Sequence, residues 1–143
     1  MYARTALFTL AIAAATPAAA EWGSNGSIAI ANPSNEVTVG ISFDARESCN
    51  VAHLFIIGND EILGVAPVVD SKIFDTRLMD NPMPNIVLSV AEAPLLRALK
   101  TGTIAGLSTD KGIIMFTLTG SANALNSAFE GCLQELADSY VRF

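Results

Sequence analysis

The sequence is poor in the side chains on which catalysis and metal binding most often depend. Histidine and tryptophan each occur once in 143 residues, and cysteine occurs twice. One histidine and two distant cysteines do not have the spacing of a zinc site. Neither GSNGS (residues 23–27) nor TGSAN (residues 119–123) is a G-x-S-x-G nucleophile elbow, and the sequence has no glycine-rich phosphate loop or cofactor-attachment motif. We therefore expect no catalytic residues, no metal and no cofactor.

Basic residues are also scarce, at eight against fourteen acidic ones. No two of them are adjacent in the sequence, so they do not form a phosphate-binding cluster. Binding to nucleic acid or to anionic lipid relies on concentrated positive charge. The composition therefore argues against both partners, and the acidic excess is typical of a soluble protein surface.

The only extended apolar run lies at the N-terminus. Arg4 precedes an apolar stretch at residues 6–15, and the alanines at 18–20 give the small-residue pattern of a cleavage site. This is a secretory signal peptide, with cleavage predicted after Ala20. The run is too short to span a bilayer, which takes about 20 residues. We expect a periplasmic or secreted protein with no stable membrane insertion.

The predicted export bears on the state of the two cysteines. Oxidising compartments allow disulfides to persist, and two cysteines permit one intramolecular pair, Cys49–Cys132. The alternative is a pair of free or intermolecular thiols. Removal of Arg4 with the signal peptide leaves seven basic residues against fourteen acidic ones, a formal charge of −7.

Residues 21–143 are predicted to form a single β-rich domain. Apolar and polar residues alternate over Val37–Phe43, which is typical of a strand with one buried face. Val51–Ile57 is apolar on both faces except at His53, which indicates a more central strand. Further strands are expected at 27–31, 61–69 (irregular or at an edge), 72–79 and 86–90, and a hairpin at 103–108 and 113–119.

Two segments have helical spacing. Residues 92–100 place leucines on one face and end before Gly102, which is a helix-stop signal. Ser121 is positioned to cap a final helix. The helical spacing of that segment places four apolar side chains on one face, those of Leu125, Phe129, Cys132 and Leu136. The predicted fold is α+β and mainly antiparallel, a curled sheet or small β-sandwich with a short mid-chain helix and a C-terminal helix. Trp22 is expected to pack over the end of the sheet.

Acidic residues recur at Asp70, Asp75 and Asp80, a spacing that invites a metal interpretation. In an extended segment, neighbours five residues apart face opposite sides. Asp70 and Asp80 would share a face but lie about 33 Å apart, too far for one ion. These residues are therefore interpreted as solvated strand and loop positions. Asp60–Glu61 is a turn pair that could join an ion site only if the fold brings another carboxylate near.

The second half of the chain resembles a family of exported proteins. The resemblance is carried by VVDSKIF (68–74), APLLRALKTGT (93–103) and FTLTGSANALNSAFEGC (116–132), with ESCN (47–50) similar to an early cysteine motif. These segments resemble small exported proteins of Gram-negative bacteria of the invasion-associated locus B type and related periplasmic proteins. The resemblance implies an exported β-rich accessory protein without catalytic residues.

Three classes of function follow from the sequence. The leading hypothesis is a non-enzymatic exported accessory protein that binds another protein, an envelope or secreted one, or an envelope component, because export and a disulfide are predicted and no catalytic constellation is found. One alternative is a small-ligand carrier with a pocket between sheet and closing helix. The other is an envelope hydrolase that uses His53 or acidic residues, with His53 as its best candidate.

Overall fold

The computed structural model describes residues 21–34, 36–62, 65–79, 83–110 and 112–141. The predicted signal peptide and Asp80 lie outside these residues. Two antiparallel sheets are present, in the strand orders β1-β2-β3-β4-β8-β7 and β10-β9-β5-β6. The strands are β1 (Trp22–Asn25), β2 (Ile28–Ala31), β3 (Val37–Phe43), β4 (Ala52–Gly58), β5 (Val65–Val69), β6 (Lys72–Ile73), β7 (Arg77–Met79), β8 (Ile86–Ala91), β9 (Ile104–Thr109) and β10 (Gly112–Thr117).

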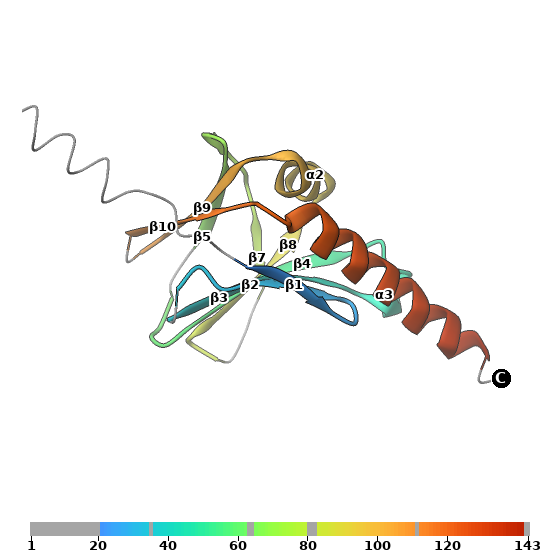
Figure 1. The fold of residues 1–143 in the computed structure, drawn as a ribbon. Coiled ribbons are helices and arrows are strands. Elements are labelled where there is room, and N and C mark those ends of the chain that lie inside the picture. The colour runs from blue at the N-terminus through green and yellow to red at the C-terminus, as the bar shows by residue number, and fades with distance from the viewer. Residues whose placement is uncertain (1–20, 35, 63–64, 80–82, 111, 142–143) are drawn as a thin grey trace, which may run out of the picture.

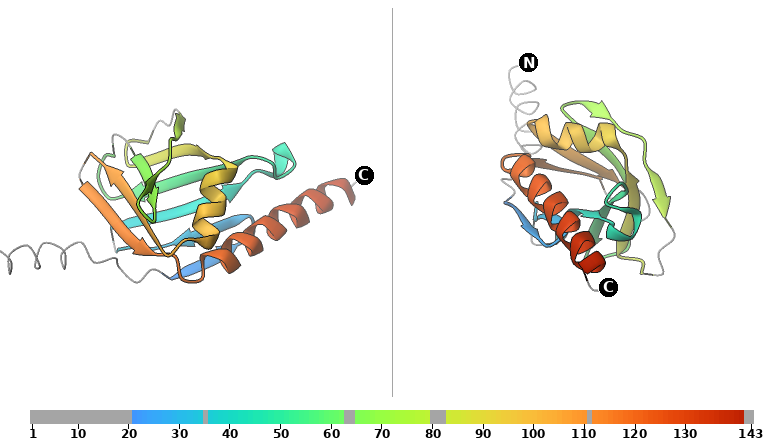
Figure 2. Two further views of the ribbon diagram at one scale, coloured as in Figure 1. Left: turned by 90° about the horizontal axis from the view of Figure 1, so that it is seen from above. Right: turned by 90° about the vertical axis from the view of Figure 1, so that its right-hand side faces the viewer.

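The helices lie with the smaller sheet on one side of the six-stranded sheet (Figures 1 and 2). They are the short turn η1 (Ala45–Glu47), α2 (Ala93–Thr101) and the long α3 (Ser121–Val141). The two sheets do not close into a barrel. The predicted α+β fold, with a mid-chain helix and a C-terminal helix, is therefore confirmed. None of the described helices combines the length and apolar character that a membrane crossing requires.

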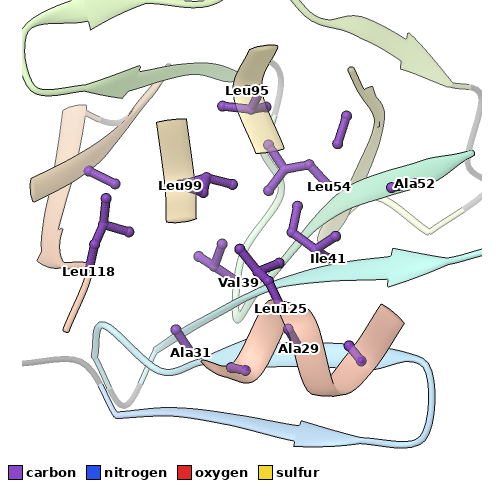
Figure 3. Close-up of a cluster of buried hydrophobic side chains, with 14 of the residues drawn as sticks. Ala29, Ala31, Val39, Ile41, Ala52, Leu54, Leu95, Leu99, Leu118 and Leu125 are labelled. Atoms are coloured by element: carbon purple, nitrogen blue, oxygen red, sulfur yellow. The ribbon is translucent and has the colours of Figure 1, made fainter. Parts of the chain in front are cut away.

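The core follows from the alternation in the central strands. In β3 the side chains of Val39, Ile41 and Phe43 point inward and are 2%, 0% and 6% exposed. The inward residues of β4 meet leucines from α2, and Leu125 of α3 fills the remaining side (Figure 3). Burial of this apolar surface is the main term that stabilises the fold.

The predicted disulfide joins Cys49 to Cys132, with their Cα atoms 6.0 Å apart. Cys49 follows η1, whose start is capped by the Asp44 carboxylate. Cys132 lies on the buried side of α3 with Leu125, and both are 0% exposed. The predicted apolar face of α3 is confirmed for these two residues. Phe129 on the same helix is 38% exposed and contacts Phe43 edge-to-face at 5.4 Å.

In the region 61–79 strands that are consecutive in the sequence do not always pair with each other. Strand β5 follows β4 in the sequence but pairs with β9 and β6 in the other sheet. The predicted single strand 72–79 is two strands, β6 in the four-stranded sheet and β7 in the six-stranded sheet. Buried Phe74 lies between them, and its N–H donates to the Pro67 carbonyl at 2.9 Å. The chain crosses between the sheets at this point.

The N-terminal stretch GSNGS belongs to the β1–β2 hairpin, so the six-stranded sheet begins at Trp22, before the first predicted strand at 27–31. Gly26 makes the turn with φ of +59°, a conformation that glycine adopts without steric cost. Trp22 packs as predicted over the end of the sheet. Its ring lies 6.2 Å from that of Phe116, and its Nε1 donates to the Thr117 carbonyl at 3.1 Å.

Ser121 begins α3 as predicted, but its hydroxyl has a different role from the expected cap. The hydroxyl donates to the Leu99 carbonyl in the last turn of α2, at 2.6 Å. Ser121 is 0% exposed. The hydrogen bond therefore links the two helices inside the core.

Replacing Ser121 by alanine is expected to lower the free energy of unfolding by about 1–3 kcal/mol, because the buried Leu99 carbonyl would lose its partner. Ser89 supplies a matched control. It is also 0% exposed, but its hydroxyl has no hydrogen-bond partner among the described residues. Ser89→Ala is expected to leave stability unchanged or to raise it. Urea unfolding of both variants measures the difference, and equal losses would contradict the assigned role of Ser121.

Candidate functional site

His53, the sole histidine, lies in β4 with its side chain on the side of the six-stranded sheet that faces away from the core. It stands directly opposite Ser42 of β3 and Val90 of β8. An open pocket of about 280 Å³ adjoins it and is lined also by Asp44, Arg46 and Glu135. The structure therefore brings a serine, a histidine and an aspartate to one pocket.

The hydrogen bonds that would make these groups a catalytic triad are missing. Within the described part of the chain, His53 bonds neither Ser42 nor Asp44. The Asp44 carboxylate instead accepts from the Arg46 N–H at 2.9 Å and from its guanidinium at 3.2 and 3.3 Å. The side-chain hydrogen bond from Arg46 is the main cause that lowers the pKa of the Asp44 carboxyl. Asp44 is thus engaged in capping η1, and the hydrolase hypothesis gains no orienting acid from it.

The interior gives little room for a carried ligand. The enclosed space between the sheets, bordered by Trp22, Leu54, Leu99 and Phe116, measures about 10 Å³. That is the space of about one water molecule, whereas ligand pockets measure roughly 300–1,000 Å³. This space between the sheets therefore gives the carrier hypothesis no ligand-sized pocket.

The acidic residues singled out in the sequence are dispersed. The Asp70 carboxylate accepts from the backbone N–H groups of Thr103 and Ile104 at 3.0–3.2 Å, so it ties the β5–β6 turn to the start of β9. Asp75 is exposed between β6 and β7. Asp60 lines a surface cleft together with Glu36. No group of three or more potential metal ligands occurs within the described ranges.

The six-stranded sheet has an uncovered side that faces away from the core, here named the outer face. Residues directly opposite each other on paired strands share a face, so the strand registers define its members. Two rows cross six strands and a third crosses three. The rows are Asn25, Ile28, Ser42, His53, Val90 and Arg77; Gly23, Ile30, Gly40, Phe55, Leu88 and Met79; and Thr38, Ile57 and Ile86.

The outer face is apolar and open to solvent. Ile57 is 38% exposed and Met79 is 43% exposed. The isoleucines, leucine, valine and phenylalanine around them are only partly buried. No described helix or strand packs against this side of the sheet (Figure 1). Contiguous apolar patches of this kind mark interaction sites in soluble proteins.

The Phe55 ring lies over Gly40 at the centre of this face. A Cβ at Gly40 on the neighbouring strand would overlap the Phe55 ring, so the ring lies flat across the glycine. Gly40 is buried as a result. The pair produces a smooth apolar surface in the middle of the sheet, where a tall side chain would otherwise stand.

The outer face also has an unusual charge. Within the three rows His53 and Arg77 are the only ionisable side chains, and acidic side chains stand at the borders, Asp44 and Glu135 beside His53 and Glu21 beside Gly23. Protein interfaces have centres depleted of charge and enriched in aromatic residues, methionine and arginine. The outer face has that composition.

The sequence contained a signal for this surface. The apolar character of both faces of 51–57 predicted a more central strand, and β4 does lie between β3 and β8 in the six-stranded sheet. The structure covers only the face of Leu54 and Ile56, which are 3% and 0% exposed, and leaves Phe55 and Ile57 open. Strand β8 repeats the pattern with Val87 buried and Leu88 partly exposed.

Comparison with known proteins adds no assignment to these observations. The chain matches no protein-family profile, no curated protein and no solved structure. The resemblance to exported proteins of the invasion-associated locus B type therefore stays a prediction.

Proposed function

We propose that the chain is an exported, non-enzymatic binding protein that docks another envelope or secreted protein on its outer face. The observation that carries the proposal is the uncovered apolar sheet surface around Phe55 and Leu88. The N-terminal signal sequence and the disulfide support the expectation of export.

The charge of the surface bears on its partner. Arg77 lies on β7, an edge strand of the six-stranded sheet, whereas His53 shares its pocket with Asp44 and Glu135. Arg77 favours a folded partner protein whose apolar patch carries an acidic side chain at that edge. A second copy of this chain fits less well, because it would present the same arginine. An anionic membrane is disfavoured by the acidic excess of the whole molecule.

A photo-crosslinking amino acid placed at Leu88 tests the proposal in the exporting bacterium. We expect one exported protein to be crosslinked and then identified by mass spectrometry. Binding of that purified protein is expected to weaken by about tenfold or more with Leu88→Asp, because a carboxylate would be buried unpaired at the contact. Thermal unfolding of the variant checks that the fold is retained.

Ile73→Asp is the matched control, since Ile73 is 69% exposed but lies on β6 of the other sheet. This variant is expected to bind the crosslinked partner as the unmodified protein does. The proposal fails if Leu88 crosslinks only to copies of the same chain or to nothing, or if the two variants weaken binding equally.

A further inference from the structure

A surface pocket lies between α2 and the β5–β6 hairpin of the four-stranded sheet. It measures about 380 Å³, which is within the range of small-molecule sites. The apolar part of its lining is formed by Val69, Phe74, Pro94 and Ala98. Val69 and Phe74 are 4% and 9% exposed, so they give the pocket a floor that is part of the core.

The two sides of this pocket are held together by the β5–β6 turn. The Asp70 carboxylate in that turn accepts from the backbone N–H of Thr103, directly after α2, at 3.0 Å. Gly102 at the end of α2 allows the close approach, because a Cβ there would overlap the Val69 side chain. The pocket is therefore formed in the absence of a ligand, which lowers the cost of binding one.

Two of the chain's eight basic residues line this pocket, although they are far apart in the sequence. Lys72 comes from β6 and Arg97 from α2, and both side chains are exposed. The Lys72 Nζ lies 5.2 Å from the centre of the Phe74 ring, a cation–π contact that holds the ammonium at the pocket without neutralising its charge. Neither cation has an ion pair within the described ranges.

The charges of the lining leave an excess of one positive charge. Asp70 is the acidic side chain in the described lining, against Lys72 and Arg97. Its carboxylate already accepts backbone N–H groups after α2, so its charge is partly compensated. A ligand with a single negative charge balances the pocket.

The carbonyl groups at the end of α2 are the remaining source of repulsion for an anion. The Ala98 carbonyl accepts from the Gly102 N–H at 2.7 Å, and the Leu99 carbonyl accepts from the Ser121 hydroxyl at 2.6 Å. Both are therefore occupied inside the protein. The repulsion from the helix end is reduced accordingly.

We propose that this pocket binds a small organic monocarboxylate with an apolar body. The Arg97 guanidinium is a planar fork that matches a carboxylate, and Lys72 adds a second positive charge. The floor around Phe74 takes the apolar body. A dianion such as phosphate is less suitable, because its second charge would stand unmatched near Asp70. This site is separate from the outer face, which belongs to the other sheet.

The test uses phenylacetate, with phenylacetamide as a neutral analogue of nearly the same shape. Amide chemical shifts are measured by NMR on the full chain. We expect millimolar phenylacetate to shift the amides of Lys72, Phe74 and Ala98 in a saturable manner. Phenylacetamide is expected to bind about fivefold or more weakly, because it lacks the charge that the two cations attract. Inorganic phosphate is expected to leave these amides unchanged.

Variants separate the pocket from the general charge of the surface. Arg97→Gln and Lys72→Met are each expected to weaken phenylacetate binding about threefold. Lys100→Gln is the matched control, since it removes one positive charge from the same helix but from a residue outside the pocket lining. It is expected to bind as the unmodified protein does, and thermal unfolding checks that each variant is folded.

Leu88→Asp on the outer face is also expected to bind phenylacetate unchanged, which keeps this inference separable from the proposed function. The inference is overturned if the pocket amides show no saturable shift or if phenylacetamide binds as tightly as phenylacetate. Equal weakening by Arg97→Gln and Lys100→Gln would overturn it as well, because the attraction would then come from the surface charge of α2 as a whole.

Discussion

Replacing both Cys49 and Cys132 by alanine is expected to lower the free energy of unfolding by about 4–5 kcal/mol. The bond closes a loop with a sequence separation of 83 residues. In the chain-entropy description, closing a loop of this length restricts the unfolded chain by that amount. Both cysteines are buried, at 4% and 0% exposure, so alanine adds no polar group to the core. Urea unfolding at constant pH measures the difference.

Reduction of the unmodified protein is the control for that experiment. Dithiothreitol is expected to lower its stability to a similar extent without changing any side chain other than the two cysteines. The reduced protein and the double variant should therefore unfold at nearby urea concentrations. A loss below about 1 kcal/mol in both cases would show that the bond does not stabilise the fold through its long loop.

Replacing Gly131 by alanine is expected to destabilise the protein by about 1–3 kcal/mol or more. In an exposed helix the same change would stabilise by about 1 kcal/mol, so the predicted sign is opposite to helix propensity. The reason is a close approach. A Cβ at Gly131 of α3 would overlap the backbone carbonyl of Gly26 in the β1–β2 turn. Because that neighbour is backbone, the helix or the hairpin must move as a unit.

Gly23→Ala is the matched control, since a Cβ at Gly23 would meet no atom within 4 Å. Its effect is expected to stay within about 0.5 kcal/mol, as for most surface substitutions. Thermal and urea unfolding of the two variants give the comparison. A stabilised Gly131→Ala protein would mean that α3 does not sit against the hairpin as described.

Local patterns in the sequence predicted the helices and strands better than they predicted which strands pair with each other. The alternation in Val37–Phe43 and the leucine spacing before Gly102 were sufficient, because each depends on neighbours a few residues away. Pairing depends on distant segments. Nothing local distinguishes a single strand over 72–79 from two strands in different sheets. That division is made by Phe74 entering the core and by the partners available on each side.

The candidate site was predicted less well for a related reason. His53 stood out because it is the only histidine, yet the surface on which it lies is formed largely by apolar residues, among them Phe55 and Ile57. A strand with apolar side chains on both faces can have both faces packed inside its own domain. A strand with one face packed in the core and the other bound by a partner protein has the same apolar pattern. The sequence of one chain does not distinguish these two cases.

The position of the disulfide along α3 has a mechanical consequence. Cys132 anchors the helix, and the residues beyond it continue past the body of the protein (Figure 2). At 1.5 Å per residue, residues 133–141 extend over about 13 Å. Glu135 still lines the pocket beside His53, whereas residues 137–140 are exposed. Fraying that starts at this end of the helix is expected to stop at the cross-link and to leave the packing around Leu125 unchanged.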